Sequence, residues 1–543
     1  MSPTDALETL LAHLSPDQRA AATAAPGPIL CIAPAGSGKT TTLVARIAWR
    51  IAAGVDPATI CAITFNARAA EELRARVGPA LAVDASAVEI RTFHALGRAI
   101  LVDAGFAVEP LADRATVLRA TFPDLGPHGW RSLDDEVSRL KLDAMVTLAD
   151  VEADPEPGPL GLAFLAYERA IAATGGLDFD DLVARALRVV RDNPELRARW
   201  RTRCAELFVD EVQDVDRSQL ALALELAAPE NRIFLVGDDD QSIYGWRLAD
   251  VRRIIGLADR LPGLRRFDLV TNRRCPAVVV ERAARLVAHN EERFAKTIRA
   301  APGAHGRLLL APDAADDAER VRHVLALWPD DGSSRAFLAR TNRELLPALA
   351  VLLEAGIPFR AVDLPTDLVD PAVDRLLEAA TSTDGRLPPL VRLGLARRSI
   401  VAGSPVDDPE AADPSAIAGS VLGWAAGFDD LDDLAQAIAR ARVRLRELRR
   451  DDAPLTLATA HATKGLEFDH VAILGMEAGR FPSGRSTAEA ADPRRALEEE
   501  RRLAYVAWTR ARRSLTLVYD PGTPSSFLLE AFSTDELGVE IAA

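Results

Sequence analysis

The feature that most constrains the fold is an apolar run that leads into a glycine-rich loop near the start of the chain. Residues 29–33 are apolar, residues 34–40 read PAGSGKT, and a helical pattern begins at Thr41. A strand, a glycine loop and a helix in this order surround a phosphate group with backbone N–H groups and a helix N-terminus. Lys39 would reach the β- and γ-phosphates of a nucleotide, and Thr40 would ligate magnesium. A generic glycine turn is the alternative, but GSGKT directly after a strand is a specific signal.

A second apolar run ends in two adjacent carboxylates, in the segment LFVDEVQD (207–214). In ATPases with such a glycine loop, the aspartate at a strand end holds magnesium, and we assign this role to Asp210. Glu211 would orient and deprotonate the attacking water. Adjacent acids are common by themselves, so this motif gains its weight from the preceding strand and from the loop upstream. Together the two motifs predict hydrolysis of ATP with Mg²⁺.

A third segment, VGDDDQSIYGWR (236–247), places a cluster of three aspartates and Gln241 shortly before Tyr244 and Trp246. Aromatic faces bind single-stranded bases by stacking, at about 1–3 kcal/mol per base. The segment therefore predicts that a phosphate-sensing group, Gln241, lies beside residues that stack on nucleobases. The alternative is an acidic turn followed by core aromatics.

Hydrolysis of ATP also needs positive charge on the γ-phosphate, often from an arginine finger worth about 10³–10⁵ in rate. Arg274 in LVTNRRCPA and Arg510 in EEERRLAYVAWTRAR are the two candidates. For each, a surface ion pair is an equally good explanation in a chain this rich in arginine.

The net charge of −15 counts against a passive nucleic-acid coat but leaves room for a local basic groove. No signal peptide and no run of about 18 apolar residues is present, so we expect a cytoplasmic protein that does not associate with a membrane. The four cysteines lie far apart in the sequence, which argues against a zinc site and a disulfide framework.

Lysine is rare in this chain and occurs only at Lys39, Lys141, Lys296 and Lys464. A retained lysine can mark a site where a planar guanidinium cannot replace a compact ammonium. Lys39 and Lys464 fall inside motifs, whereas chance retention is a credible explanation for Lys141.

With GSGKT, VDEVQD, GDDDQSIYGWR and EEERRLAYVAWTRA in this order, the chain resembles superfamily 1A helicases of the UvrD, Rep and PcrA type. Further segments that resemble the motifs of this family extend from about residue 14 to residue 519. They are LSPDQRAA (14–21), ITFNARAAEELRARV (63–77), IRTFHALGRAIL (90–101), LDFDDLV (177–183), TNRRCP (271–276), FLARTNRE (337–344) and LTLATAHATKGLEFDHVAILGMEAGRFP (455–482).

The resemblance assigns roles to individual residues. The predicted catalytic residues are Lys39, Asp210, Glu211, Gln241, Arg274 and Arg510, with Thr40 and Asp210 holding magnesium. The predicted cofactor-binding residues are Gln18, Ala35, Gly36, Ser37, Gly38, Lys39, Thr40, Thr41, Arg273 and Glu467, with Gln18 on the adenine base. The predicted DNA-binding residues are Phe65, Thr92, Phe93, His94, Tyr244, Trp246, Arg247, His461 and Lys464.

The resemblance also implies an α/β fold with two RecA-like cores, each a parallel sheet flanked by helices, and with helical insertions. ATP and Mg²⁺ would be the cofactors. Single-stranded DNA and junctions of single- and double-stranded DNA would be the partners of a 3′→5′ helicase or translocase in DNA repair or replication restart. A protein loading partner is a further candidate, and we expect a monomer or a weak dimer.

The motif positions predict the domain layout. The first core, 1A, would comprise residues 1–95 and 200–266, with a helical insertion, 1B, at 96–199. The second core, 2A, would comprise 267–360 and 454–543, with a reduced insertion, 2B, at 361–453. This last segment contains an acidic, turn-rich stretch (404–415) and one amphipathic helix candidate (431–450). Leu434, Ile438, Val443 and Leu445 give that candidate its helical spacing. We favour a packing helix there over an element that grips duplex DNA.

Two positions depart from the family pattern, because Arg273 replaces an aromatic residue and Thr41 replaces an arginine. These positions sandwich the adenine in relatives, so selectivity for adenine is open. Two other functions stay open as well. The chain could be a nucleotide-switched accessory ATPase subunit of a repair or phage-defence complex, or it could act on RNA, since stacking does not detect a 2′-OH group.

Overall fold

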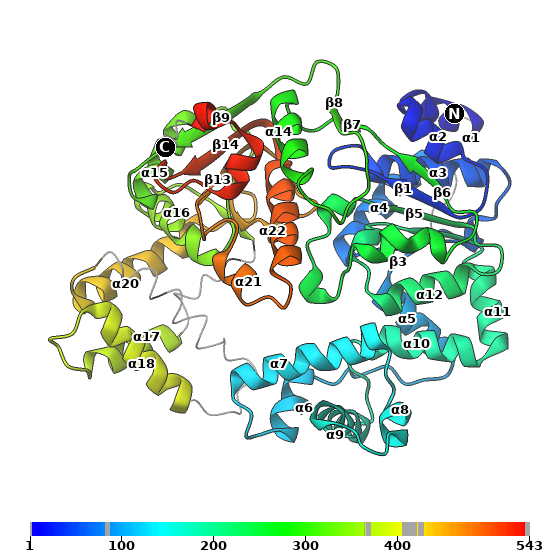
Figure 1. The fold of residues 1–543 in the computed structure, drawn as a ribbon, viewed down its shortest axis with the longest axis horizontal. Coiled ribbons are helices and arrows are strands. Elements are labelled where there is room, and N and C mark those ends of the chain that lie inside the picture. The colour runs from blue at the N-terminus through cyan, green and yellow to red at the C-terminus, as the bar shows by residue number, and fades with distance from the viewer. Residues whose placement is uncertain are drawn as a thin grey trace. The chain divides into compact units, whose positions relative to one another are not determined.

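The computed structural model of the chain describes residues 3–81, 87–362, 364, 371–403, 421 and 428–537. The chain divides into two compact units. Unit 1 comprises Met1–Thr271 and Glu292–Thr297, and unit 2 comprises Asn272–Glu291 and Ile298–Ala543. Each unit contains one six-stranded parallel sheet with flanking helices (Figure 1). This confirms the predicted α/β class with two RecA-like cores. Within the described part of the chain, no helix has the length and hydropathy of a membrane span.

The sheet of unit 1 has the strand order β3-β2-β4-β5-β1-β6. Its strands are β1 (Ile29–Ile32), β2 (Ile60–Thr64), β3 (Glu89–Thr92), β4 (Glu206–Val209), β5 (Ile233–Gly237) and β6 (Arg265–Asp268). Successive residues of a strand face opposite sides of a sheet, and both sides are covered here. Leu30 and Ile32 therefore pack into one apolar core, and Ile29 and Cys31 into another. Burial on both faces explains why these strands read as continuous apolar runs.

Helices from two parts of the sequence cover the two faces of this sheet (Figure 1). One core includes residues of α5 (Phe93–Asp103), α10 (Asp181–Asp192), α11 (Pro194–Arg203) and α12 (Arg217–Ala227). The other includes residues of α1 (Pro3–Ala12), α2 (Pro16–Thr23), α3 (Lys39–Ala52) and α4 (Ala67–Leu81). Of the helices in the predicted insertion 96–199, α10, α11 and the part of α5 from residue 96 onward thus share a core with the sheet.

The helices between α5 and α10 have an apolar core of their own. They are α6 (Arg114–Thr121), α7 (Pro127–Ser138), the π-helical turn η3 (Arg139–Ala144), α8 (Leu148–Ala153) and α9 (Pro159–Ala173). Val117, Val137, Phe164 and Ile171 are among the buried residues of this core.

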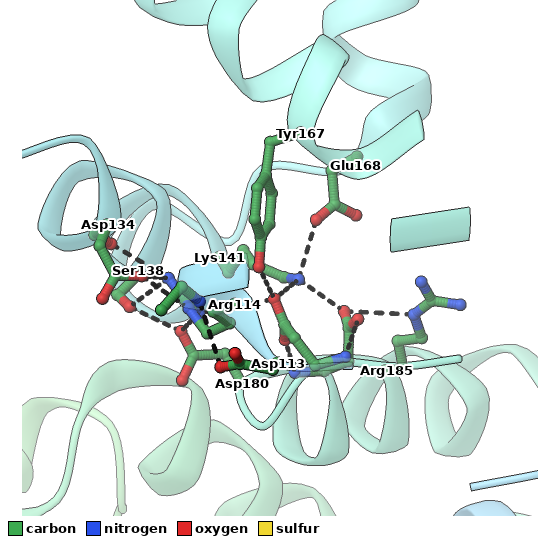
Figure 2. A network of polar contacts seen from close by, with 12 residues as sticks. Asp113, Arg114, Asp134, Ser138, Lys141, Tyr167, Glu168, Asp180 and Arg185 are labelled. Carbon is green, nitrogen blue, oxygen red and sulfur yellow. Dashed lines mark hydrogen bonds and ion pairs between the residues drawn. The ribbon is translucent and has the colours of Figure 1, made fainter. Parts of the chain in front are cut away.

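A buried ionic network connects these helices to the start of α10 (Figure 2). The Lys141 ammonium lies 2.8 Å from carboxylate oxygens of Glu168 and Asp178 and 2.9 Å from one of Asp181. The side chains of Lys141, Asp178 and Asp181 are at most 2% exposed. Burial acts to lower the pKa of Lys141, but the three carboxylates outweigh it and hold this pKa above its ordinary value. Lys141 therefore has a structural role, and chance retention no longer explains it.

The sheet of unit 2 has the order β11-β12-β10-β13-β14-β9, again with parallel neighbours. Its strands are β9 (Arg307–Pro312), β10 (Arg335–Ala339), β11 (Arg360–Val362), β12 (Leu455–Thr459), β13 (Phe468–Ile473) and β14 (Ala511–Tyr519). Helices α14 (Ala277–Val287) and α22 (Pro493–Trp508) pack together and contact β9 and β13. Helices α15 (Asp317–Leu327) and α16 (Asn342–Ala355) share an apolar core with β10 and β12.

Within 361–453, the described helices are α17 (Pro371–Thr381), α18 (Pro389–Gly403) and α20 (Leu431–Leu448). Leu434, Ile438 and Leu445 of α20 are buried in the same core as β10 and β12, which confirms the packing helix. Val443 is 60% exposed, and Ala441 takes the inward position instead. The acidic stretch 404–415 lies outside the described residues.

Replacing Lys141 by methionine leaves three buried carboxylates without their shared cation. Removing one partner of a buried ion pair costs about 3–5 kcal/mol. We therefore expect Lys141→Met to lower the free energy of unfolding of unit 1 by about this amount, as measured by urea denaturation. Arg139→Met is the matched control, because Arg139 pairs with Glu136 at the surface and such pairs contribute about 0–1 kcal/mol. A Lys141→Met loss no larger than that of Arg139→Met would contradict this role.

Candidate nucleotide and nucleic-acid sites

The predicted phosphate-binding and stacking residues of unit 1 follow the carboxyl ends of neighbouring strands. The glycine loop follows β1, Asp210 follows β4, and Asp238 follows β5. Phe65 follows β2, and Thr92 is the last residue of β3. Because the strands are parallel, these ends meet at one edge of the sheet, where open α/β sheets bind their ligands.

The glycine loop has the backbone that a phosphate cradle needs. Gly36 and Gly38 have φ values of 66° and 85°, a left-handed conformation that glycine adopts without strain. Gly38 is the N-cap of α3, so the first N–H groups of this long helix point into the loop. The Ser37 hydroxyl is buried and has no hydrogen-bond partner among the described residues. A bound phosphate oxygen would accept a hydrogen bond from this hydroxyl, so the loop fits a phosphate group.

Gln18 braces this loop from inside unit 1. Its Nε2 donates to the Ser37 carbonyl at 2.8 Å, and its Oε1 accepts from the backbone N–H of Ser15 at 2.9 Å. A Cβ atom at Gly38 would lie 2.4 Å from Gln18 Nε2, so this position needs glycine for space as well as for its φ. Gln18 is 3% exposed, and its adenine-reading role remains a prediction.

A chain of polar contacts links the loop lysine to the turn after β5. Lys39 Nζ lies 3.3 Å from the Glu211 carboxylate, which also accepts a hydrogen bond from Gln213 Nε2. Gln213 Oε1 accepts from the backbone N–H of Asp238 at 3.0 Å, and Gln241 Nε2 donates to Asp238 Oδ2 at 2.6 Å. Four polar contacts thus connect Lys39 with Gln241.

Two acids at the end of β4 occupy different environments. Asp210 is buried, and its Oδ1 accepts from the backbone N–H of Glu211 at 2.9 Å. Glu211 has a φ of 52°, which is uncommon for a residue other than glycine. Such backbone conformations concentrate at functional sites and persist when the surrounding structure holds them. The contacts of Glu211 to Lys39 and Gln213 provide that support.

Aromatic side chains form a partly exposed surface at the same edge. The rings of Phe65 and Tyr244 are stacked, 5.0 Å apart, and Trp246 meets Tyr244 edge-on at 6.1 Å. Trp246 is 62% exposed, and the Arg247 guanidinium lies 4.6 Å from its ring centre. The exposure of Trp246 excludes the alternative that these aromatics all belong to the core.

Sequence reasoning missed one aromatic of this edge, Phe179. Its ring is 51% exposed and stacks on His94, with ring centres 3.9 Å apart. Burial and the nearby Arg247 lower the pKa of His94 to about 4, so its ring is neutral at neutral pH. The available signal was a phenylalanine flanked directly by aspartates in LDFDDLV.

Thr92 and Phe93, two of the predicted DNA-binding residues, have local structural roles. The Thr92 hydroxyl caps α5 by accepting from the backbone N–H of Ala95 at 3.2 Å. Phe93 is 4% exposed and packs in the core beneath the sheet, so its ring presents no face to a nucleobase. The predicted place of Phe93 near the DNA strand stays a prediction.

In unit 2, Glu467, a predicted nucleotide-binding residue, lies near the two predicted catalytic arginines, Arg274 and Arg510. Arg274 Nε donates to the Glu467 carboxylate at 2.6 Å, and Arg512 pairs with the same carboxylate. Arg510 is 2% exposed, and its Nε and Nη1 donate to the carbonyls of Val506 and Leu466. Glu467 and Arg510 directly precede β13 and β14, so this cluster lies at the amino edge of the sheet.

The predicted DNA-binding residues of unit 2 follow the carboxyl end of β12, at the opposite edge of the sheet from Glu467 and Arg510. His461 begins the 3₁₀ turn η9 (His461–Thr463), and Lys464 comes next, half-buried. Burial and the nearby Arg340 lower the pKa of His461 to about 4. Arg273, which stands where the family pattern has an aromatic residue, is exposed.

Two protein-family models match this chain. Residues 14–262 match the UvrD/REP helicase N-terminal domain, and residues 424–521 match the UvrD-like helicase C-terminal domain. The first match covers the sheet of unit 1 except β6, and the second covers the strands β12 to β14 of unit 2.

The chain is also similar to characterised proteins over nearly its whole length. It is 28% identical to DNA helicase II of Escherichia coli, over 94% of this chain and 85% of the relative. It is 26% identical to the ATP-dependent DNA helicase PcrA of Staphylococcus epidermidis, over 94% and 83% of the two chains. It is 28% identical to the ATP-dependent DNA helicase Rep of Escherichia coli, over 93% and 90%. Motif order, the two parallel-sheet units and these matches agree, and the chain belongs to the UvrD/Rep family of helicases.

Proposed function

We propose that this protein is an ATP-dependent DNA helicase that moves 3′→5′ along single-stranded DNA. The observation that carries the proposal is the contact chain from Lys39 through Glu211 and Gln213 to Asp238 and Gln241. It connects the phosphate loop to the segment that presents Tyr244 and Trp246. A helicase needs such a connection, because nucleotide state has to alter the grip on a base. The names of the relatives support DNA as the substrate and do not favour an accessory subunit without unwinding activity.

ATP and Mg²⁺ fit the residues of unit 1. The loop N–H groups and Lys39 would hold the phosphates, and the Thr40 hydroxyl and Asp210 carboxylate would hold the metal. When bound, Mg²⁺ supplies charge that neutralises the phosphate oxygens. Glu211 would accept a proton from the attacking water, with Gln213 orienting its carboxylate. Arg274 and Arg510 of unit 2 remain the candidates for charge on the transferred phosphoryl group.

Single-stranded DNA would lie against the aromatic surface of unit 1, with base-stacking faces supplied by Phe65, Tyr244, Trp246, His94 and Phe179. Arg247 would neutralise backbone phosphates there, which is compatible with the acidic net charge because a local groove decides binding. His461 and Lys464 are the corresponding candidates in unit 2.

The layout 1A, 1B, 2A and reduced 2B is part of this proposal. The alignment with DNA helicase II extends over 617 positions, more than the 543 residues of this chain, so the relative carries segments without a counterpart here. A short 2B at 361–453 would account for such a difference. We propose a cytoplasmic monomer or weak dimer in DNA repair or replication restart, with a protein loading partner.

The proposed function is tested first by steady-state ATP hydrolysis without nucleic acid and with single-stranded DNA, duplex DNA or single-stranded RNA. We expect strong stimulation by single-stranded DNA, followed by unwinding of a 3′-tailed but not a 5′-tailed duplex. Preference for a 5′ tail would overturn the polarity, and stimulation by RNA alone would overturn the substrate. Equal rates under all conditions would favour an accessory ATPase.

Replacing Lys39 by alanine removes the loop ammonium and leaves the aromatic surface intact. We expect Lys39→Ala to reduce DNA-stimulated hydrolysis by about 10²-fold or more, while the Kd for single-stranded DNA stays within about twofold. Arg260→Ala, which removes an exposed cation of the same unit, is the control. Hydrolysis at the wild-type rate in Lys39→Ala would exclude this loop as the catalytic site.

Replacing Trp246 or Phe179 by alanine removes one stacking face. We expect each change to weaken binding of single-stranded DNA by about 1–3 kcal/mol, measured by fluorescence anisotropy of a labelled oligonucleotide. Phe106→Ala is the matched control, because Phe106 is also exposed but lies beyond the opposite end of α5 from His94. An affinity equal to that of Phe106→Ala would remove the tested ring from the strand-binding surface.

A further inference from the structure

The chain returns to unit 1 for one short segment. After α14 in unit 2, residues Glu292–Thr297 belong to unit 1, and the chain then continues in unit 2 from Ile298. This segment contains Lys296, one of the four lysines of the sequence. No motif assigned a role to it.

Lys296 is buried against three consecutive aspartates of the turn after β5. Its Nζ lies 2.9 Å from Asp238 Oδ1 and 2.8 Å from Asp240 Oδ2, and it also pairs with Asp239. The Lys296 side chain is 1% exposed and the three aspartate side chains are 0% exposed. Arg293 forms a bidentate contact with Asp240, in which Nε donates to Oδ1 at 3.0 Å and Nη2 donates to Oδ2 at 2.8 Å.

Three adjacent buried carboxylates repel one another, and Lys296 offsets that repulsion. Burial and the neighbouring aspartates raise the pKa of Asp239 to about 6, against the opposing effect of Lys296. Burial also acts to raise the pKa of Asp240, but Lys296 and Arg293 outweigh it and hold this pKa below its ordinary value. At this buried position one compact ammonium contacts all three carboxylates.

Asp238 connects Lys296 to the catalytic candidates. Its carboxylate is shared, because Oδ1 accepts from Lys296 at 2.9 Å and Oδ2 accepts from Gln241 at 2.6 Å. Its backbone N–H donates to Gln213, which in turn donates to Glu211. A continuous path of polar contacts therefore joins Lys296 to Gln241 through one intervening residue, Asp238. The path from Lys296 to Glu211 passes through two, Asp238 and Gln213.

We propose that Lys296 is a positioning residue for nucleotide hydrolysis. It acts by holding Asp238, whose carboxylate accepts from Gln241 and whose backbone N–H donates to Gln213 of the Gln213–Glu211 pair. The inference rests on the proposed ATP-dependent function and extends it to a residue outside the motifs. Lys296 makes no contact with the glycine loop among the interactions described above, so its removal affects turnover more than nucleotide binding.

The first experiment measures kcat and the KM for ATP of Lys296→Met at saturating single-stranded DNA. We expect kcat to fall by about tenfold or more and KM to stay within about threefold, because the phosphate cradle is intact. Lys141→Met is the matched control, since it removes a lysine that is equally buried against three carboxylates in the same unit. We expect Lys141→Met to lose a similar amount of thermal stability and to keep its kcat within about twofold.

A charge-matched double variant separates positioning from charge balance. Lys296→Met together with Asp239→Asn keeps the net charge of the cluster, and the asparagine Oδ1 can still accept from the Phe294 N–H. We expect this variant to regain thermal stability relative to Lys296→Met but not to regain kcat, because the contact to Asp238 is still missing. It also gives a folded protein to measure if Lys296→Met does not fold.

The outcomes distinguish this inference from the proposed function. If the wild-type protein hydrolyses ATP and the double variant keeps a kcat within twofold of it, the positioning role of Lys296 is overturned and the proposed function stands. Recovery of kcat in step with stability would do the same. A wild-type chain without nucleotide hydrolysis would overturn the proposed function, and this inference with it.

Discussion

Hydrogen bonding between parallel strands determines where the candidate residues of unit 1 lie. Parallel neighbours need crossover connections, and here helices supply them on both faces of the sheet. Every carboxyl end therefore reaches the same edge, so the glycine loop, the acids after β4 and the aromatic turn after β5 become neighbours. The candidate sites depend on this edge, because none of these segments alone contains both the glycine loop and the aromatic side chains.

Two buried lysines of unit 1 each neutralise a cluster of buried carboxylates. Lys141 and Lys296 each contact three carboxylates and are almost inaccessible to solvent. Removing such charged groups from water costs desolvation free energy, and only close, well-oriented ion pairs offset that cost. One cluster ties the helices α6–α9 to α10 (Figure 2). The other ties the segment Glu292–Thr297 to the turn that carries Gln241. In both clusters a single buried ammonium is the cation that the three carboxylates share.

Part of the candidate site could be predicted residue by residue. The strand–loop–helix around Lys39 and the acids at the end of β4 depend on local backbone geometry, which short sequence segments encode. Trp246 was also predicted correctly as an exposed ring. The inward position predicted for Val443 was wrong, because the helical spacing of apolar residues does not reveal which of them faces a core. Phe179 was missed because its stacking partner, His94, is far away in the sequence.

The sequence by itself determined the α/β class, the glycine loop, the order of the motifs and the family, since each can be read from short local segments and from their order along the chain. Only the tertiary structure decided that Gln18 braces the glycine loop and that Lys39 connects to Gln241. It also decided that Lys141 and Lys296 neutralise buried carboxylates. The physical reason is the same in each case. These contacts join side chains from separate elements, and their value comes from burial and from distances that only the packed sheet and helices create.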